Sequence, residues 1–498
     1  MKWPEMLPLL VLGSSLVPGL IIFAVPERSR NLRSALNIGG AILKLVLVAW
    51  MTWKSGEGVH YEFRAAILPG LDLVLRSGAM ALFFVGLSAL LWLVTTIYAV
   101  GYLEDSPHRS RFFGFFSICV TATVGAALAG NLVTFLVFYE LLTLSTYPLV
   151  VHRETDEARR AGRVYLAYTL AGGALATIGT LWLYNVTGTL EFVAGGIVAP
   201  FIDGQARTLC IIFVILVTGI GVKAALVPLH GWLPRAMIAP APVSALLHAV
   251  AVVKVGAFGL MRIVFSVYGI DVTISQGLAQ GLAIFAAVTI LYGSLRALTQ
   301  SNLKRLLAYS TVSQLSFITL GITLGSPIAA TGGIVHLVHQ ALMKITLFFA
   351  AGNLAKTLGV REIRYMKGVG RRMPWTMAAF TLCAFGMIGV PPLAGFVTKW
   401  YLGVGAIDGG APWVIWLLAA SSVLNALYFL PILYSAWFEA PPANWPEERM
   451  FPLAETSLVL LLPTLFTAAA ALGVGLFASM PYSPLEWAQL ITERQFSP

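Results

Sequence analysis

The residues that could do chemistry in this sequence are the few ionisable side chains that interrupt long apolar runs. Of the 22 acidic residues, only Glu140 falls in the middle of such a run. Of the 32 basic residues, six fall inside apolar runs: Lys44, Lys223, Lys254, Arg262, Lys344 and Lys399. An ion at the centre of a bilayer costs about 2.5–3.5 kcal/mol on insertion scales. If these runs cross a membrane, each residue must therefore face a partner or a wetted cavity.

Glu140 is best interpreted as a proton-transfer group. Burial favours the neutral form of a carboxyl group, whereas a nearby ammonium favours the charged form, so a change in partner distance would load or release a proton. Lys223 is the expected partner, because it precedes a helix break at Pro228. The alternative is a purely structural ion pair. Snorkelling to the interface explains Arg262 well and Lys44 partly, but it explains the other four lysines poorly.

The histidines extend this polar set. His336, Gln340 and Lys344 are spaced i, i+4, i+8 and share one helix face, with His339 on a neighbouring stripe. Histidine titrates near physiological pH, so such a column with water could pass protons. A metal site is the rival interpretation, but His-x-x-His alone supports it weakly. His230 and His248 also fall in apolar runs, whereas solvated roles are expected for His60, His108 and His152.

Further polar groups occur inside the same runs. They serve either as contacts between helices or as the lining of a wetted route, and the sequence leaves both open. They are Ser244, Tyr309, Ser310, Thr311, Ser313 and Gln314.

The elements that must hold these residues are membrane-spanning helices. The chain of 498 residues is 58% apolar and 11% charged, with mean hydropathy +0.83, and apolar runs of about 18 residues or more recur throughout. This composition excludes a soluble enzyme, a nucleic-acid reader and a disordered scaffold. We predict fourteen spans, near 5–24, 35–53, 78–101, 112–129, 131–151, 164–186, 209–230, 241–268, 274–295, 306–325, 329–353, 375–405, 412–438 and 456–480. The first run is expected to be a retained span, because it lacks a clear signal-peptide cleavage site.

Loop charges predict the orientation. The odd-numbered loops carry 20 Lys and Arg residues and the even-numbered loops carry 4. The positive-inside rule then places the odd-numbered loops in the cytoplasm and both termini outside. The expected location is the inner (plasma) membrane.

A short internal sequence repeat suggests two related halves. The pattern Pro-Leu-x-Gly-aromatic occurs at 228–232 and again at 392–396, each time near a lysine, Lys223 or Lys399. Transporters built from inverted repeats carry broken helices at matching positions. We therefore predict an N-terminal three-helix segment (1–111), two inverted five-helix repeats (112–268 and 269–440), each with a broken helix, and a C-terminal transmembrane helix with its tail (441–498). The span at 375–405 should be two half-helices around Pro391-Pro392.

The chain carries no motif for energy conversion. It has no Walker loop, no dinucleotide-binding glycine pattern and no cysteine set for an iron–sulfur cluster. Its cysteines, Cys119, Cys210 and Cys383, fit neither a metal site nor a disulfide framework. No cofactor and no metal are therefore expected.

Five stretches of the sequence resemble the antiporter-like subunits of Mrp-type cation/proton antiporters, respiratory complex I and membrane-bound hydrogenases. They are Tyr139-Glu140, KAALVPLHGWLPRAMIAPAPVSALLHAVAVVK (223–254), LKRLLAYSTVSQLSF (303–317), HLVHQALMKITLFFAAG (336–352) and GVPPLAGFVTKW (389–400). Length and the lysine set are most similar to the D subunit of Mrp-type antiporters.

The resemblance implies roles in a proton path for matching positions. Glu140 and Lys223 would form the pair of the first half-channel, and Lys399 would be the terminal lysine of the second. The groups between them would be His248, Lys254, Lys304, His336 and Lys344. Many relatives have histidines four apart where this chain has Gln340, so the resemblance does not decide between His336 and His339.

The expected function is that of a proton-translocating subunit in a multisubunit Mrp-type Na⁺/H⁺ antiporter. Its partners would be other membrane subunits, protons and Na⁺, within the lipid bilayer and without nucleic acid. The alternative is a subunit of a redox-driven pump, similar to complex I or a membrane-bound hydrogenase. A stand-alone solute carrier is disfavoured, because the polar residues form a line more than a pocket.

Overall fold

The chain folds into a bundle of long membrane-spanning helices. The computed structural model describes residues 3–68, 70–451 and 454–496. Thirteen helical segments in these ranges are long and apolar enough to cross a bilayer, and the shorter apolar helix Pro374–Ile388 begins a fourteenth, broken crossing. Every one of the fourteen predicted spans coincides with one of these segments, so the expectation of a polytopic α-helical membrane protein is confirmed.

The helices of the first part of the chain are α1 (Trp3–Ala24), α2 (Arg30–Gly56), α3 (Ala79–Tyr102), α4 (Arg109–Leu128), α5 (Leu132–Val150), α6 (Asp156–Thr187), α7 (Ile202–Lys223), α8 (Trp232–Arg235), α9 (Ala241–Ala249) and α10 (Val252–Arg262). Those of the second part are α11 (Ile270–Ser275), α12 (Leu278–Leu298), α13 (Leu303–Thr323), α14 (Pro327–Thr357), α15 (Val369–Arg372), α16 (Pro374–Ile388), α17 (Ala394–Asp408), α18 (Trp413–Phe438), α19 (Leu458–Leu476) and α20 (Pro484–Phe496). Two strands, β1 (Glu62–Leu68) and β2 (Leu71–Arg76), pair antiparallel.

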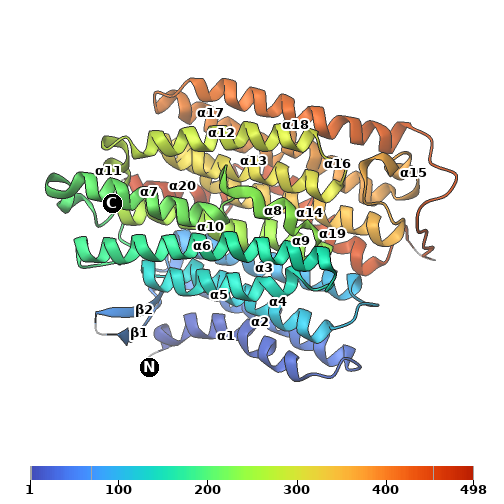
Figure 1. The fold of residues 1–498 in the computed structure, drawn as a ribbon, viewed down its shortest axis with the longest axis horizontal. Helices are drawn as coiled ribbons and strands as arrows, with labels where there is room; N and C mark the ends of the chain where they lie inside the picture. The colour runs from blue at the N-terminus through green and yellow to red at the C-terminus, as the bar shows by residue number, and fades with distance from the viewer. Residues whose placement is uncertain (1–2, 69, 452–453, 497–498) are drawn as a thin grey trace.

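The long helices lie side by side, with α1 and α2 at one edge of the bundle and α18 at the other (Figure 1). Helix α14 is the centre of the second half, because α9, α13, α16, α17, α19 and α20 all pack against it. Its apolar segment is completely buried. The predicted histidine column therefore lies in the interior of the bundle and not on a lipid-facing surface.

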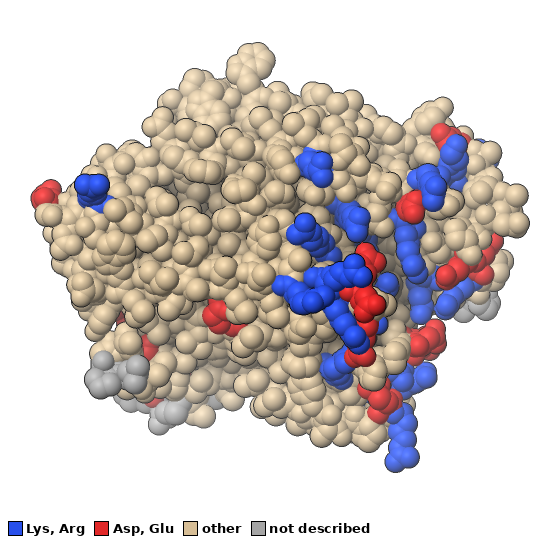
Figure 2. Space-filling model, in the orientation of Figure 1, with Lys and Arg blue, Asp and Glu red and all other residues tan. Residues whose placement is uncertain are grey.

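The two ends of the bundle differ in charge. Lys and Arg side chains gather toward one end of the molecule, at the right of the view, and few appear at the other (Figure 2). Both chain termini lie at the end that also holds the β1–β2 hairpin (Figure 1). Successive helices run antiparallel, so alternate loops emerge on the same side. The loops rich in Lys and Arg are alternate ones, and they therefore gather at one end of the bundle.

Two of the crossings are broken where the sequence predicts it. Helix α7 ends at Lys223, and Trp232 begins the single turn of α8. Helices α16 and α17 are the two expected half-helices, separated by residues 389–393. Proline explains both breaks, because it lacks an amide hydrogen and clashes with the preceding turn.

A third break was not predicted. The crossing at 241–268 divides into α9 and α10, and Val250 and Ala251 between them leave helical geometry. The amide of Ala251 bonds instead to the carbonyl of Leu246, at 2.9 Å. This break lies between His248 and Lys254. It contains neither proline nor glycine, so the sequence offered no local signal for it.

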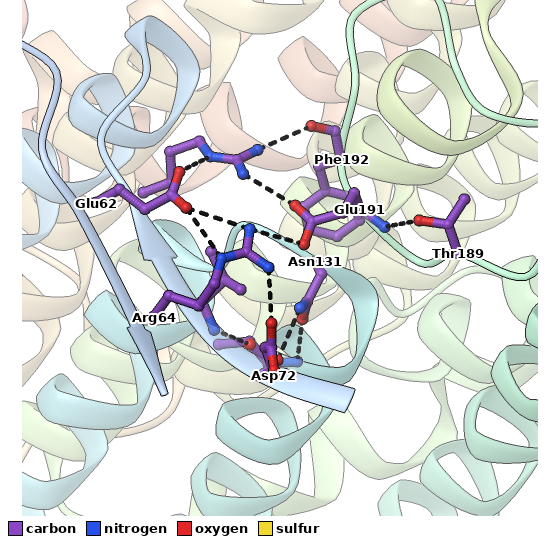
Figure 3. Close-up of polar contacts among 10 residues, drawn as sticks. Glu62, Arg64, Asp72, Asn131, Thr189, Glu191 and Phe192 are labelled. Carbon is purple, nitrogen blue, oxygen red and sulfur yellow. Dashed lines mark hydrogen bonds and ion pairs between the residues drawn. The ribbon is translucent and has the colours of Figure 1, made fainter. Parts of the chain in front are cut away.

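The segment 54–77 is more than a basic loop, because it contains the β1–β2 hairpin. Arg64 binds Asp72 at 2.9 Å and Arg76 binds Glu62 at 2.7 Å, and both arginines bind Glu191 in the connection after α6, at 3.0 and 2.9 Å (Figure 3). Burial opposes the charged form of Glu62, but the bonds and charges of Arg76 and Arg64 lower its pKa overall.

The same hairpin supports the start of α5, the helix that carries Glu140. Asn131 caps α5, accepting the amide hydrogen of Thr134 at 2.8 Å, and its side-chain amide donates to the carbonyl of Asp72 at 2.8 Å (Figure 3). An N-cap of this kind stabilises a helix by about 1 kcal/mol. The hairpin network and the first half of the bundle are therefore joined at one end of α5.

Candidate proton path

Five lysines of the predicted path share one kind of contact. Each amine donates to a backbone carbonyl on another part of the chain: Lys223 to Tyr139, Lys254 to Leu337, Lys304 to Ala239, Lys344 to Leu307 and Lys399 to Ile388. None of the ion pairs among the described residues includes any of these lysines. A neutral amine still donates a hydrogen bond, so a carbonyl anchor holds the side chain in both protonation states.

In the first half, Glu140 on α5 lies against α6. One of its carboxylate oxygens, Oε1, is buried without a hydrogen-bond partner among the described residues. The carboxylate occupies the space beside Gly173, where a Cβ atom would lie 2.6 Å from Cδ of Glu140. A buried oxygen with an open position is suited to bind a proton or water.

The structure places Lys223 near Glu140 but does not join the two in an ion pair. The two side chains are close enough to interact electrostatically. Lys223 is fully buried, donates to the carbonyl of Tyr139, and lies 3.2 Å from the centroid of the Tyr139 ring. The neighbour of Glu140 in sequence therefore holds the lysine, an arrangement that the sequence did not predict.

Between the halves, the third helix break brings His248 and Lys254 into the interior. His248 is fully buried and stacks on Phe348, with ring centroids 4.6 Å apart. Neither ring nitrogen has a hydrogen-bond partner within the described part of the chain. Lys254 donates to the carbonyl of Leu337 on α14 at 2.9 Å. Both residues are thus in position to connect α10 with the histidine-bearing helix.

Lys304 lies in a different place from the buried lysines. It lines a cleft of about 340 Å³ at the charged end of the bundle, together with Arg153, Glu157 and Arg361. Its amine donates to the carbonyl of Ala239 at 2.6 Å. His248 is close enough to interact electrostatically with Lys304, Lys254 and Lys344, so Lys304 lies within electrostatic reach of the buried groups of the predicted path.

Lys344 belongs to a short chain of side-chain hydrogen bonds. Its amine donates to the hydroxyl of Ser310 at 2.7 Å, and the hydroxyl of Tyr428 on α18 lies 2.8 Å from the same oxygen. Tyr428 also lies 2.5 Å from the side chain of Asn425. Ser310 was a candidate from the sequence, whereas Tyr428 and Asn425 were missed, because they occur among the apolar residues of a surface-lying helix.

In the second half, His336 and His339 meet at one residue that the sequence pattern did not single out. The hydroxyl of Thr398 lies 3.1 Å from Nδ1 of His336 and 2.9 Å from Nδ1 of His339. His336 is also close enough to Lys254 and Lys399 to interact with both electrostatically. Lys399 itself binds the carbonyl of Ile388 and the hydroxyl of Ser422, each at 2.7 Å. The only sequence signal for Thr398 was its position beside Lys399.

Two expectations about other residues are wrong. Lys44 does not snorkel to the interface, because its side chain is fully buried and donates to Ser15 at 2.6 Å. His152 is not solvated: it packs edge-on against Phe112, and burial lowers its pKa to about 4. His152 therefore stays neutral at physiological pH. Among residues 3–68, 70–451 and 454–496, no three His, Cys, Asp or Glu side chains are grouped so as to hold a metal ion.

The remaining polar candidates do not share one kind of contact: Thr311, for example, donates to the carbonyl of Leu307 in its own helix at 2.9 Å. Ser313 instead connects two helices, since its hydroxyl lies 2.9 Å from that of Ser294 on α12. Other polar groups are buried and lack a hydrogen-bond partner within the described ranges, among them the side-chain nitrogens of Gln314 and Gln340. Buried amide groups without partners mark places where ordered water is expected.

Comparison with known proteins identifies the chain's relatives. A family model described as NADH:quinone oxidoreductase/Mrp antiporter, transmembrane region, matches residues 129–425. The N subunit of NADH-quinone oxidoreductase from Desulforudis audaxviator is 36% identical over 427 residues, covering 82% of this chain and 82% of that protein. The D subunit of a Na⁺/H⁺ antiporter from Bacillus subtilis is 29% identical over 400 residues, covering 79% of this chain and 80% of that protein.

The fold is shared with a solved complex. A chain of the Mrp complex from Dietzia sp. DQ12-45-1b superposes with a TM-score of 0.86, covering 100% of this chain and 98% of that chain at 23% identity. The matched family region contains Glu140, the lysines of the predicted path from Lys223 to Lys399, and both helix breaks that the sequence predicted. This multi-pass membrane protein therefore belongs to the NADH:quinone oxidoreductase/Mrp antiporter transmembrane family.

Proposed function

We propose that this chain is a proton-translocating subunit of a multisubunit Mrp-type cation/proton antiporter. The observation that carries the proposal is that five lysines of the predicted path, three of them fully buried, donate to backbone carbonyls and form no ion pair among the described residues. A lysine locked to a carboxylate would keep its proton, because the paired carboxylate stabilises the ammonium. A lysine anchored on a carbonyl can give up its proton and keep its position.

The proposed path runs through both halves. A proton would load on Glu140, and the charge on Lys223 would respond, since unit charges 4 Å apart interact by about 4 kcal/mol at an effective dielectric constant near 20. The backbone of Lys223 and Ala224, where α7 ends, lies directly against Gly256 of α10, two residues beyond Lys254. The charge change would pass from there through Lys254 and the α14 histidines to Lys399.

Access to the path is proposed at two places. The cleft around Lys304 opens at the charged end of the bundle, which we assign to the cytoplasm by the positive-inside rule. Lys399 is half-buried, beside the break between α16 and α17, and would serve the second access. Both termini and the hairpin would then lie on the outer side of the inner membrane.

The partners would be other membrane subunits that bind and move the cation. The Bacillus relative is named as a subunit of a Na⁺/H⁺ antiporter, and the fold neighbour comes from an Mrp complex. We therefore propose Na⁺ as the exchanged ion. The two five-helix repeats, 112–268 and 269–440, would form the two half-channels, with 1–111 and 441–498 flanking them.

A redox-driven pump is the second candidate. The relative with 36% identity is a subunit of an NADH-quinone oxidoreductase. The same lysines would translocate protons in a complex of that kind. In both cases the chain is a transport subunit whose driving reaction occurs elsewhere.

Co-purification separates the two. The chain would be tagged in its native host, extracted in a mild detergent, and its partners identified by mass spectrometry. Small membrane subunits alone would support the antiporter, whereas flavin, iron–sulfur or nickel–iron subunits would refute it in favour of the pump. For the path itself, Glu140→Gln should abolish ion-driven ΔpH in vesicles while assembly is retained. Full transport by that variant would refute the role of Glu140.

A further inference from the structure

The hydroxyl of Thr398 lies between the two histidines of α14, within hydrogen-bond distance of both rings. It is 3.1 Å from Nδ1 of His336 and 2.9 Å from Nδ1 of His339, and all three side chains are buried. Neither Nε2 atom has a hydrogen-bond partner among the described residues. The Nδ1 atoms therefore face one shared hydroxyl, while the Nε2 atoms face outward from it.

A hydroxyl group has one hydrogen to donate. If Thr398 donates to one Nδ1, that nitrogen must be unprotonated, and the other Nδ1 must carry a hydrogen to make the second bond. Two neutral imidazoles bonded in this way must be opposite tautomers. Either histidine can take either role, so the group has two arrangements that differ in where the hydrogens lie.

We propose that Thr398 is a hydroxyl bridge that passes protons between His336 and His339. This inference rests on the proposed proton-translocating function. It assigns Thr398 as a proton-relay residue and gives both histidines a role, where the sequence left a choice between them.

The proposed transfer conserves the number of protons at every step. A proton binds the free Nε2 of the histidine whose Nδ1 carries hydrogen. That Nδ1 hydrogen then moves to the Thr398 oxygen, while the hydroxyl hydrogen moves to the Nδ1 of the second histidine. The second histidine releases its own Nε2 hydrogen. One proton has crossed, both rings are neutral again, and the tautomers are exchanged, so a further transfer in the same direction requires the hydrogens to be reset.

The surroundings place this bridge on the proposed path. Lys254 from α10 and Lys399 from α17 both interact electrostatically with His336. Phe317 of α13 packs edge-on against the His336 ring, at 5.6 Å between centroids, and lies 5.9 Å from the Lys399 amine. The bridge therefore connects the lysine of the third helix break with the lysine of the second half.

The test uses two substitutions in the assembled complex. Thr398→Val keeps the shape and removes the hydroxyl, whereas Thr398→Ser keeps the hydroxyl and removes the methyl group. Ion-driven ΔpH should fall about a hundredfold in Thr398→Val, the scale of a lost proton-transfer group, and should remain close to wild type in Thr398→Ser. Wild-type transport by Thr398→Val, or equal losses in both variants, would overturn the proposal.

A second readout does not depend on transport. Nitrogen-15 NMR of histidine-labelled protein distinguishes the two tautomers, with signals assigned by His336→Asn and His339→Asn. We expect the Nδ1–H fractions of the two rings to add up to one in the wild type, and this complementarity to be lost in Thr398→Val. Two rings that both carry the hydrogen on Nδ1, or both on Nε2, in the wild type would refute the bridge. If the wild-type complex moved no protons, the proposed function would fail, and the tautomers would still decide whether the bridge exists.

Discussion

Replacing Gly173 by alanine should reduce proton transport about a hundredfold without unfolding the protein. The new Cβ would overlap Oε1 of Glu140 and lie 2.6 Å from Cδ. Carbon atoms in contact are 3.5–4.0 Å apart, so the carboxyl group must retreat by about 1 Å. It can do so because the colliding atoms are the far end of a flexible side chain. The alanine itself stabilises α6 by about 1 kcal/mol relative to glycine.

The expected loss of transport follows from the displacement. Moving a proton-transfer group by about 1 Å can reduce a rate about a hundredfold. The assay is cation-driven ΔpH in vesicles that contain the assembled complex, with thermal unfolding of the same preparation measured in parallel. The matched control is Gly281→Ala in α12, where a Cβ meets no atom within 4 Å. That variant should gain helix stability and keep full transport.

A double substitution sharpens the test. Glu140→Asp withdraws the carboxyl group by one methylene and should reduce transport on its own. Combined with Gly173→Ala, the two losses should be less than additive, because the withdrawn group no longer meets the new Cβ. Wild-type transport by Gly173→Ala would refute this prediction and would show that the position of the Glu140 carboxyl group does not limit proton movement.

Three further predictions concern residues around the path. Tyr428→Phe removes the hydroxyl that reaches Ser310 and should lower transport several-fold while assembly, checked by gel filtration, is unchanged; full transport would exclude that hydrogen-bonded chain from the path. Lys44→Met should leave transport intact and thermal stability equal or higher, because it removes a buried amine with no acidic partner within 4 Å among the described residues. The lowered pKa of Glu62 means that its ion pairs stabilise the hairpin above about pH 5 and are lost as the pH falls through that lowered pKa. Hydrogen exchange of the hairpin amides, corrected for intrinsic rates, should therefore accelerate in acid for the wild type and not for Glu62→Gln.

The sequence by itself determined the membrane-spanning character of the chain and the candidates for its chemistry. Both depend on local composition: an apolar run long enough to span a bilayer must form a helix, and an ion inside it is too costly to be incidental. The separation of basic loops to one end also follows from counting residues along the chain. So do the breaks at 224–228 and 389–393, since proline and glycine act within a few residues of their own position.

Only the tertiary structure decided what those side chains contact. Thr398 is 62 residues from His336, and Lys254 is 83 residues from Leu337, so no local pattern could pair them. The sequence suggested a carboxylate as the natural partner of Lys223, yet the packing of α5 against α7 gives it a backbone carbonyl. Every residue carries such an acceptor, so the residue types in the sequence could not identify this one. The space beside Gly173 and the break at Val250 and Ala251 likewise exist only because helices distant in sequence pack together.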